Sequence, residues 1–285
     1  MNDAKTEAEK APAPLAATPS KRRKRNRSVS QTVQYALFVV LLLVVAFTAN
    51  WPVLASQFVR LDIAARLFPR LLTIALKNTV VYTISGFALG LVLGLIIALM
   101  RLSQVIPYRL LAGLYIEFFR GLPALVIFMF VGVGIPLAFP GSEIPGGTYG
   151  KVALGLGLVS AAYMAETIRA GIQAVPKGQM EAARSLGFSH RRAMLSIILP
   201  QAFRIIIPPL TNELVLLFKD SSLVLFLGVT LEERELTKFG RDLASETANT
   251  TPIFVAGLCY LIVTIPLGYL VRRLEARANA AQGRS

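Results

Sequence analysis

Residues 176–200 read PKGQMEAARSLGFSHRRAMLSIILP and form a polar, basic island between long apolar segments. The apolar side chains of its first half recur at helical spacing, which predicts a short helix over residues 179–186. Gly187 is expected to end this helix, because glycine adopts the left-handed backbone conformation without steric cost. Ser189 suits the N-cap of a second helix, and Pro200, which lacks an amide proton, is expected to end it. The stretch is therefore predicted to fold as two short helices joined at a glycine.

Composition identifies a polytopic membrane protein. Of the 285 residues, 54% are hydrophobic, and they are concentrated in long runs. The net charge of +14 comes from basic residues that cluster beside these runs, as cytoplasmic segments do, so no nucleic-acid partner is expected. The single cysteine, Cys259, and the single histidine, His190, exclude an internal disulfide and offer no metal site. No cofactor is expected.

The apolar runs predict an all-α fold with six transmembrane helices. Residues 1–33 are basic and poor in aromatics, which predicts a disordered cytoplasmic tail, and residues 34–50 form an extra N-terminal transmembrane helix. Residues 58–72 combine interspersed charges with apolar positions at helical spacing, which predicts an interfacial helix. Five further spans are expected at residues 73–100, from Pro123 onward, and at residues 152–172, 203–227 and 252–271.

Two of these spans have distinctive sequences. A doubled G-x-x-x-G over residues 86–94 permits close helix packing in lipid. In the fifth span, Pro208 and Pro209 are expected to prevent a regular start, and the polar residues 219–222 (KDSS) interrupt the apolar run. Irregular polar backbone at membrane depth is tolerated only where protein or a water-filled cavity surrounds it. The fifth span is therefore predicted to be broken.

The distribution of charge predicts the topology. With six spans, the N-terminal tail, the loop at residues 173–200 and the basic C-terminus share one side, which places both termini in the cytoplasm. The opposite side holds an acidic loop whose members are Glu232, Glu233, Glu235, Asp242 and Glu246. Three basic residues that fit this topology poorly are Arg60, Arg66 and Arg70.

Residues 176–200 resemble the cytoplasmic EAA loop of permeases from binding-protein-dependent ABC importers. The family pattern is E-A-A, three residues, G, nine residues, I-x-L-P, and the chain matches it without departure. The matching residues are Glu181, Ala182, Ala183, Gly187, Ile197, Leu199 and Pro200. In that family the loop forms a coupling helix seated in a cleft of the ATPase subunit. The resemblance implies that these residues contact an ATPase.

Three further segments resemble the polar amino-acid branch of that family, the histidine, glutamine and glutamate type. Residues 117–126 (EFFRGLPALV) resemble E-x-F-R-G-T-P-L-L-V, with Leu122 in place of Thr. Residues 161–172 (AAYMAETIRAGI) resemble A-Y-x-A-E-x-x-R-x-G-I. Residues 199–223 resemble L-P-Q-A-x-R…P…N…K-D-T-S-L, with Ser221 in place of Thr. The resemblance covers about residues 70–275 and implies a permease domain there.

This family membership would make the chain the permease subunit of an ATP-driven amino-acid importer in a bacterial inner membrane. The implied partners are ABC ATPase subunits, a second permease that is identical or homologous, an external solute-binding protein and membrane lipid. No G-x-x-x-x-G-K-[ST] loop occurs in the sequence, so ATP hydrolysis is expected in a separate subunit and the chain is not an enzyme. The alternative is an ion-coupled secondary amino-acid transporter, which needs no ATPase.

Polar and charged side chains within the spans mark a predicted translocation path, because a charge costs about 2.5–3.5 kcal/mol at the centre of a span. Glu166 can pair with Arg169, three residues later, or meet the ammonium group of a solute, and the sequence supports both equally. Glu117 and Arg120 share the same spacing, and pairing with each other is favoured over the alternative, contact with the substrate. The predicted path residues are Glu166, Tyr163, Asn212, Lys219 and Asp220.

Overall fold

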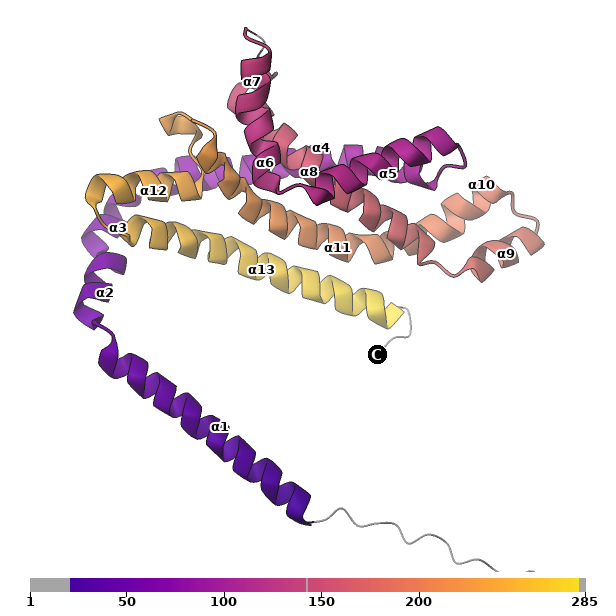
Figure 1. Cartoon of the computed structure of the whole chain (residues 1–285). Coiled ribbons are helices and arrows are strands. Elements are labelled where there is room, and N and C mark those ends of the chain that lie inside the picture. Colours follow the sequence, from indigo (N-terminus) through magenta and orange to yellow (C-terminus); the bar gives the residue numbers. More distant parts are fainter. Residues whose placement is uncertain (1–20, 142, 282–285) are drawn as a thin grey trace, which may run out of the picture. The chain divides into compact units, whose positions relative to one another are not determined.

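A computed structural model describes residues 21–141 and 143–281, and within them every regular element is a helix (Figure 1). The chain divides into two compact units, residues 1–53 and 54–285. In chain order the α-helices are α1 (Lys21–Thr48), α2 (Trp51–Phe58), α3 (Leu61–Leu67), α4 (Lys77–Leu102), α5 (Ile106–Gly121), α6 (Ala124–Met129), α7 (Ile135–Ala138), α8 (Gly147–Gln173), α9 (Lys177–Ser185), α10 (His190–Ala193), α11 (Leu199–Asp220), α12 (Leu236–Thr247) and α13 (Thr251–Ala281).

The prediction of an all-α protein with six spans is confirmed. Among the described residues, five helical stretches are long and apolar enough to cross a membrane, and a bent helix pair makes a sixth. The five stretches are Gln31–Thr48, Leu71–Leu102, Gly147–Gln173, His190–Phe226 and Thr251–Ala278. The bent pair joins α5 to the segment Ala124–Ala138 at an angle of 102°. Leu122 and Pro123 are both extended at the bend, because a proline disfavours helical backbone at the residue before it.

The first unit contains α1, which starts earlier than predicted. This helix begins at Lys21, so residues 21–33, assigned to a disordered tail, are helical instead. Arg, Lys and Gln are good helix formers, and once the apolar run has formed a helix each added residue extends it cheaply. Residues 1–20, the rest of the predicted tail, lie outside the described residues.

In the second unit, α4 and α8 pack closely through the predicted small residues. A Cβ added to Gly86 would lie 2.5 Å from the Cβ of Leu156 on α8. A Cβ added to Gly90 would lie only 2.1 Å from the Oγ of Ser160. Both distances are shorter than real contacts of this kind, so only glycine allows the two backbones to approach this closely. The doubled G-x-x-x-G is therefore a packing surface, as predicted.

The fifth span differs from its prediction in two respects. Its α11 runs without a break past Pro208 and Pro209, so the predicted irregular start is wrong. Pro200 lies in the first turn of α11 and does not end the preceding helix, because a π-helical turn (Met194–Ile198) leads directly into α11. Proline is tolerated in a first turn, where its missing N–H would be unpaired, and in a membrane helix whose neighbours satisfy the freed carbonyls. The irregular segment begins only at Ser221, where a 3-10 helix follows.

Two connecting segments are more ordered than their sequences indicated. The predicted interfacial helix over residues 58–72 is represented by α3, and a π-helical turn (Leu71–Leu76) already starts the next span. The predicted acidic loop contains α12, which packs against the beginning of α13. Leu236 and Phe239 of α12 are buried with Leu71 in one apolar cluster.

Candidate functional site: a coupling loop and a membrane cavity

The loop at residues 176–200 has the helix–glycine–helix form that its sequence predicts. Helix α9 ends at Ser185, and Gly187 has a left-handed backbone with φ of +86°. The N–H of Gly187 donates to the carbonyl of Arg184 at 3.0 Å, and the N–H of Phe188 donates to the carbonyl of Ala183 at 3.1 Å. This pair of bonds is the Schellman motif, which satisfies the last carbonyls of the helix. The predicted role of Gly187 is confirmed.

The second half of the loop joins the transmembrane core. The Ser189 hydroxyl accepts a hydrogen bond from the N–H of Arg192 at 3.3 Å, so its predicted N-cap role is confirmed. Ile198, in the π-helical turn that follows α10, is buried in a core cluster with residues of α4, α5, α8 and α11. Met180 of α9 and Ile197 pack against the same cluster. The loop is therefore anchored on the membrane-spanning helices at both ends.

The predicted coupling residues divide into anchors and exposed side chains. Ala183 is buried, and Ile197 and Leu199 are half-buried, whereas Glu181, Ala182, Gly187 and Pro200 are exposed. The helix predicted over residues 179–186 would place Leu186 on one face with Met180 and Ala183. Leu186 is instead 78% exposed, because α9 ends before it and the chain turns away. Glu181 makes no ion pair among the described residues. The loop thus presents an uncovered surface on a fixed backbone.

A cavity of about 250 Å³ lies between the α5–α6 bend, α8 and α11. Three of its walls come from different parts of the chain, with Leu122 at the bend, Tyr163 on α8 and Asp220 at the end of α11. The other lining residues are Ala124, Phe128, Leu156, Val159, Ser160, Glu213, Leu216 and Leu217. Tyr163 and Asp220 were predicted path residues, and the structure brings them together.

The other three predicted path residues do not line this cavity. Glu166 accepts a hydrogen bond from the Nε of Arg169 at 3.0 Å and a second from its terminal nitrogen. Of the two alternatives for Glu166, the structure shows local pairing. Asn212 and Lys219 are exposed on α11 and are not among the lining residues.

Two interactions at this cavity differ from the sequence analysis. The predicted pair of Glu117 and Arg120 is absent from the ion pairs of the described residues, and Arg120 lies over the Tyr163 ring instead, at 5.5 Å. Glu213 lines the cavity and was missed. The sequence could have indicated its role, because Glu213 and the predicted path residue Asp220 are seven residues apart and so lie on one face of a helix. Neither carboxylate has an ion-pair partner in the described part of the chain.

Comparison with known proteins identifies the class of this membrane protein. The family model described as "Binding-protein-dependent transport system inner membrane component" matches residues 90–280. The chain belongs to this family.

Individual relatives are similar over most of their length. A probable glutamine ABC transporter permease protein, GlnM of Bacillus subtilis, is 42% identical over 204 residues, which cover 70% of this chain and 89% of that protein. The arginine transport system permease protein ArtQ of the same organism is 36% identical, with 73% and 91% covered. A solved structure, the crystal structure of an amino acid ABC transporter with histidines, matches with a TM-score of 0.69 at 34% identity, covering 78% of this chain and all of that one.

These similarities decide between the two transport classes that the sequence left open. The two relatives are named as permease proteins and the solved structure as an amino acid ABC transporter, and nothing among them supports an ion-coupled secondary transporter. The chain is a permease of an ABC importer, an inner-membrane component with several membrane-spanning helices.

Proposed function

We propose that this chain forms the translocation path of an amino-acid importer and transmits ATP hydrolysis in a partner subunit through residues 176–200. The observation that carries the proposal is the anchored loop, whose Schellman motif fixes a surface that none of the described residues covers. Relatives named for glutamine and arginine transport support the substrate class. The complete assembly would add a second permease, two ATPases and an external solute-binding protein.

The exposed surface of the loop suits a cleft on an ATPase. Leu186 offers a large apolar side chain, and the small Ala182 beside Glu181 allows close approach of another surface. An exposed apolar side chain at the centre of a contact commonly supplies much of its binding energy. We therefore assign Leu186 to the coupling surface together with the residues that match the EAA pattern.

The cavity suits a zwitterionic solute. Glu213 and Asp220 are free to stabilise an ammonium group, because neither has an ion-pair partner in the described part of the chain. Arg120, over the ring of Tyr163, can approach the carboxylate of the same solute. Charges in a partly desolvated cavity interact more strongly than charges in bulk water. Among the five predicted path residues, we retain Tyr163 and Asp220, and we add Glu213.

The proposed orientation places both termini and the coupling loop in the cytoplasm. Labelling of single cysteines in intact cells tests it, with Cys259 first replaced by alanine. Ser189→Cys in the loop should resist a membrane-impermeant thiol reagent, whereas Ser245→Cys on α12 should react, and both positions are exposed. Labelling of Ser189→Cys from outside would contradict this orientation.

Uptake into proteoliposomes tests the function itself. The full chain is reconstituted with its co-purified ATPase, and a panel of labelled amino acids is supplied with and without ATP. Uptake should require ATP inside and a binding protein outside. Uptake driven by a sodium or proton gradient in the absence of ATP would contradict the proposal.

Two substitutions test the assignment of Glu213 and Asp220 to the solute-binding cavity. Glu213→Gln and Asp220→Asn should raise the apparent KM for uptake several-fold while basal ATP hydrolysis persists, because each removes one charge facing the ammonium group. Glu166→Gln is the matched control, since it removes a span carboxylate that is already paired with Arg169. An unchanged KM in both cavity variants, or a raised KM in the control alone, would exclude the assigned site.

A further inference from the structure

We propose that a second cavity, between α11 and α13, binds the phosphate group of an anionic phospholipid. This cavity measures about 300 Å³, and its charged lining residues are Arg204 and Arg277. The remaining lining residues are Ile207, Pro208, Leu274 and Ala278. Helices α11 and α13 pack along each other (Figure 1), and the residues that line the cavity lie in the first half of α11 and near the end of α13.

The two guanidinium groups lack partners in the part of the chain that the structure describes. Neither Arg204 nor Arg277 forms an ion pair or a side-chain hydrogen bond with any described residue. Arg169 and Arg234 show the contrast, because each is paired with a carboxylate. A guanidinium group binds phosphate oxygens through two parallel N–H donors. Two unpaired groups at one cavity therefore leave an uncompensated positive site for an anion.

The surroundings favour a lipid as the source of that anion. Arg277 lies one residue before the end of the stretch Thr251–Ala278, and Arg204 lies in the second turn of α11, close to where the coupling loop ends. Phe203, beside Arg204, is 57% exposed, and Ile207 of the cavity wall is also exposed. Such apolar side chains suit contact with acyl chains, while arginines at the helix ends reach the headgroup layer. Basic pockets between membrane helices bind anionic headgroups by this combination.

The cavity lies at the end of the bundle that carries the coupling loop, because α11 begins where that loop ends. A bound lipid would bridge the start of α11 to the end of α13. An acidic surface of an ATPase subunit is the competing occupant. The lipid is favoured because Phe203 and Ile207, which are exposed beside Arg204, are apolar, although exposed charged residues, Arg273 and Glu275, lie near Arg277 on α13.

Native mass spectrometry of the purified full chain tests this inference without depending on transport. The protein in detergent is mixed with phosphatidylglycerol, cardiolipin or phosphatidylcholine, and retained lipid is counted. We compare the wild type with the double variant Arg204→Gln/Arg277→Gln and with Arg272→Gln, which removes a charge from the same end of α13 outside the cavity. The double variant should lose about tenfold or more in affinity for the anionic lipids, and the control should retain wild-type affinity.

Three outcomes would overturn the inference. The first is equal retention by the double variant and the Arg272→Gln control, which would mean diffuse attraction to basic segments. The second is full competition by inorganic phosphate or glycerol phosphate, which would mean a soluble anion. The third is unchanged lipid retention with loss of ATPase co-purification, which would mean a protein contact. Partial recovery in Arg204→Lys/Arg277→Lys separates lost charge from misfolding.

Discussion

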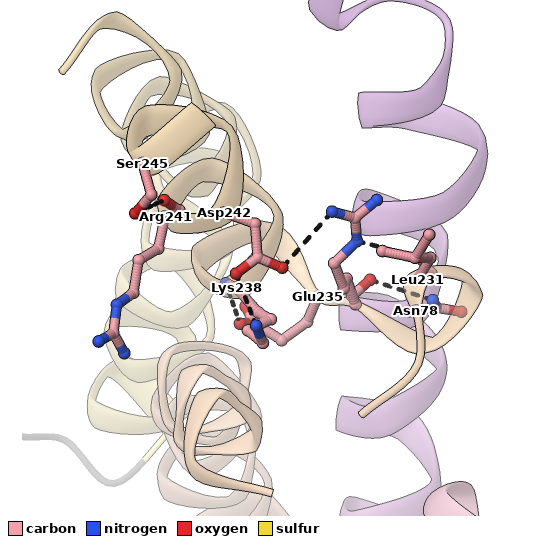
Figure 2. Close-up of polar contacts among 8 residues, drawn as sticks. Asn78, Leu231, Glu235, Lys238, Arg241, Asp242 and Ser245 are labelled. Atoms are coloured by element: carbon pink, nitrogen blue, oxygen red, sulfur yellow. Dashed lines mark hydrogen bonds and ion pairs between the residues drawn. The ribbon is translucent and has the colours of Figure 1, made fainter. Parts of the chain in front are cut away.

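The coupling loop and the segment at residues 231–247 lie at opposite ends of the long helices α11 and α13. They differ in whether their charged side chains are exposed and unpaired or buried and paired. In the coupling loop, Glu181 is exposed and unpaired among the described residues. At the other end, Glu235 is fully buried, and Arg234 and Lys238 both pair with Asp242 (Figure 2). The sequence marks the first region clearly and the second only as an acidic loop.

The buried network holds the outer segment onto the helices. The side-chain nitrogen of Asn78 on α4 donates to the carbonyls of Glu232 and Arg234, at 2.7 and 3.1 Å. The Glu235 carboxylate accepts a hydrogen bond from the N–H of Lys238 (Figure 2) and another from the N–H of Thr237, both at 2.6 Å, and so caps α12. The hydroxyl of Tyr260 on α13 donates to the same carboxylate at 2.8 Å.

The contrast distinguishes a structural scaffold at residues 231–247 from a contact surface on the coupling loop. Buried polar groups must find hydrogen-bond partners within the chain, so a network such as that of Glu235 ties α4, α12 and α13 together. Exposed charges without partners contribute little to stability and remain available to another molecule. Substitutions at the two ends should therefore affect different measurements.

The largest expected effect is on stability, at the buried end. Glu235→Ala leaves two helix N–H groups and the Tyr260 hydroxyl without their acceptor, which should lower the free energy of unfolding by about 2–4 kcal/mol. Thermal unfolding of the detergent-solubilised chain measures this loss. Glu246→Ala, at an exposed position of the same helix, is the control and should change little. Equal effects of both substitutions would show that the network does not stabilise this end.

The next effect is on coupling. Gly187→Asp meets no steric obstacle, since a Cβ there has nothing within 4 Å, but it forces a left-handed backbone that costs about 1–2 kcal/mol. The loop should shift while the chain still inserts, so ATPase co-purification and uptake should both fall. Gly178→Asp is the control, because the same replacement enters the first turn of α9, where an acidic group is favourable. Normal coupling in Gly187→Asp would show that the left-handed turn is dispensable.

Two further substitutions, one in each region, test the comparison and should have smaller effects. Glu181→Gln should leave the free energy of unfolding within about 0.5 kcal/mol of the wild type yet weaken ATPase co-purification. Asp242→Asn should do the reverse, because it removes the partner of Arg234 and Lys238 far from the loop. Should the two variants affect both measurements alike, the division into scaffold and contact surface fails.

The smallest effect concerns pH. Burial raises the pKa of the Glu235 carboxyl above its ordinary value of 4.5, against the opposing effect of its hydrogen bonds. Between that value and the raised one, the folded state keeps a proton that the unfolded state has released. The contribution of this group to stability therefore falls as pH rises through this interval. Glu235→Gln has no proton to lose and should show a flatter dependence of thermal midpoint on pH just above 4.5. Parallel pH profiles would contradict this.

The features that depend on local interactions could be predicted from the sequence alone. Apolar runs mark the spans because each must cover its backbone in lipid, whatever its neighbours are. Gly187 and Ser189 were predictable because a left-handed cap and an N-cap are set by a few adjacent residues. The glycines at residues 86–94 were predictable as a packing surface for the same reason, although the sequence does not name α8 as the partner.

Whether a charged side chain is paired, buried or lines a cavity depends on the tertiary structure. Glu166 and Glu213 both lie in spans, yet the first pairs with Arg169 and the second lines a cavity with Asp220. The continuity of α11 past its prolines, and the burial of Glu235, likewise depend on the helices that surround them. The physical reason is that the free energy of a charge or an unpaired carbonyl is set by the groups within a few ångströms of it. In a folded membrane protein those groups come from other helices, distant in sequence.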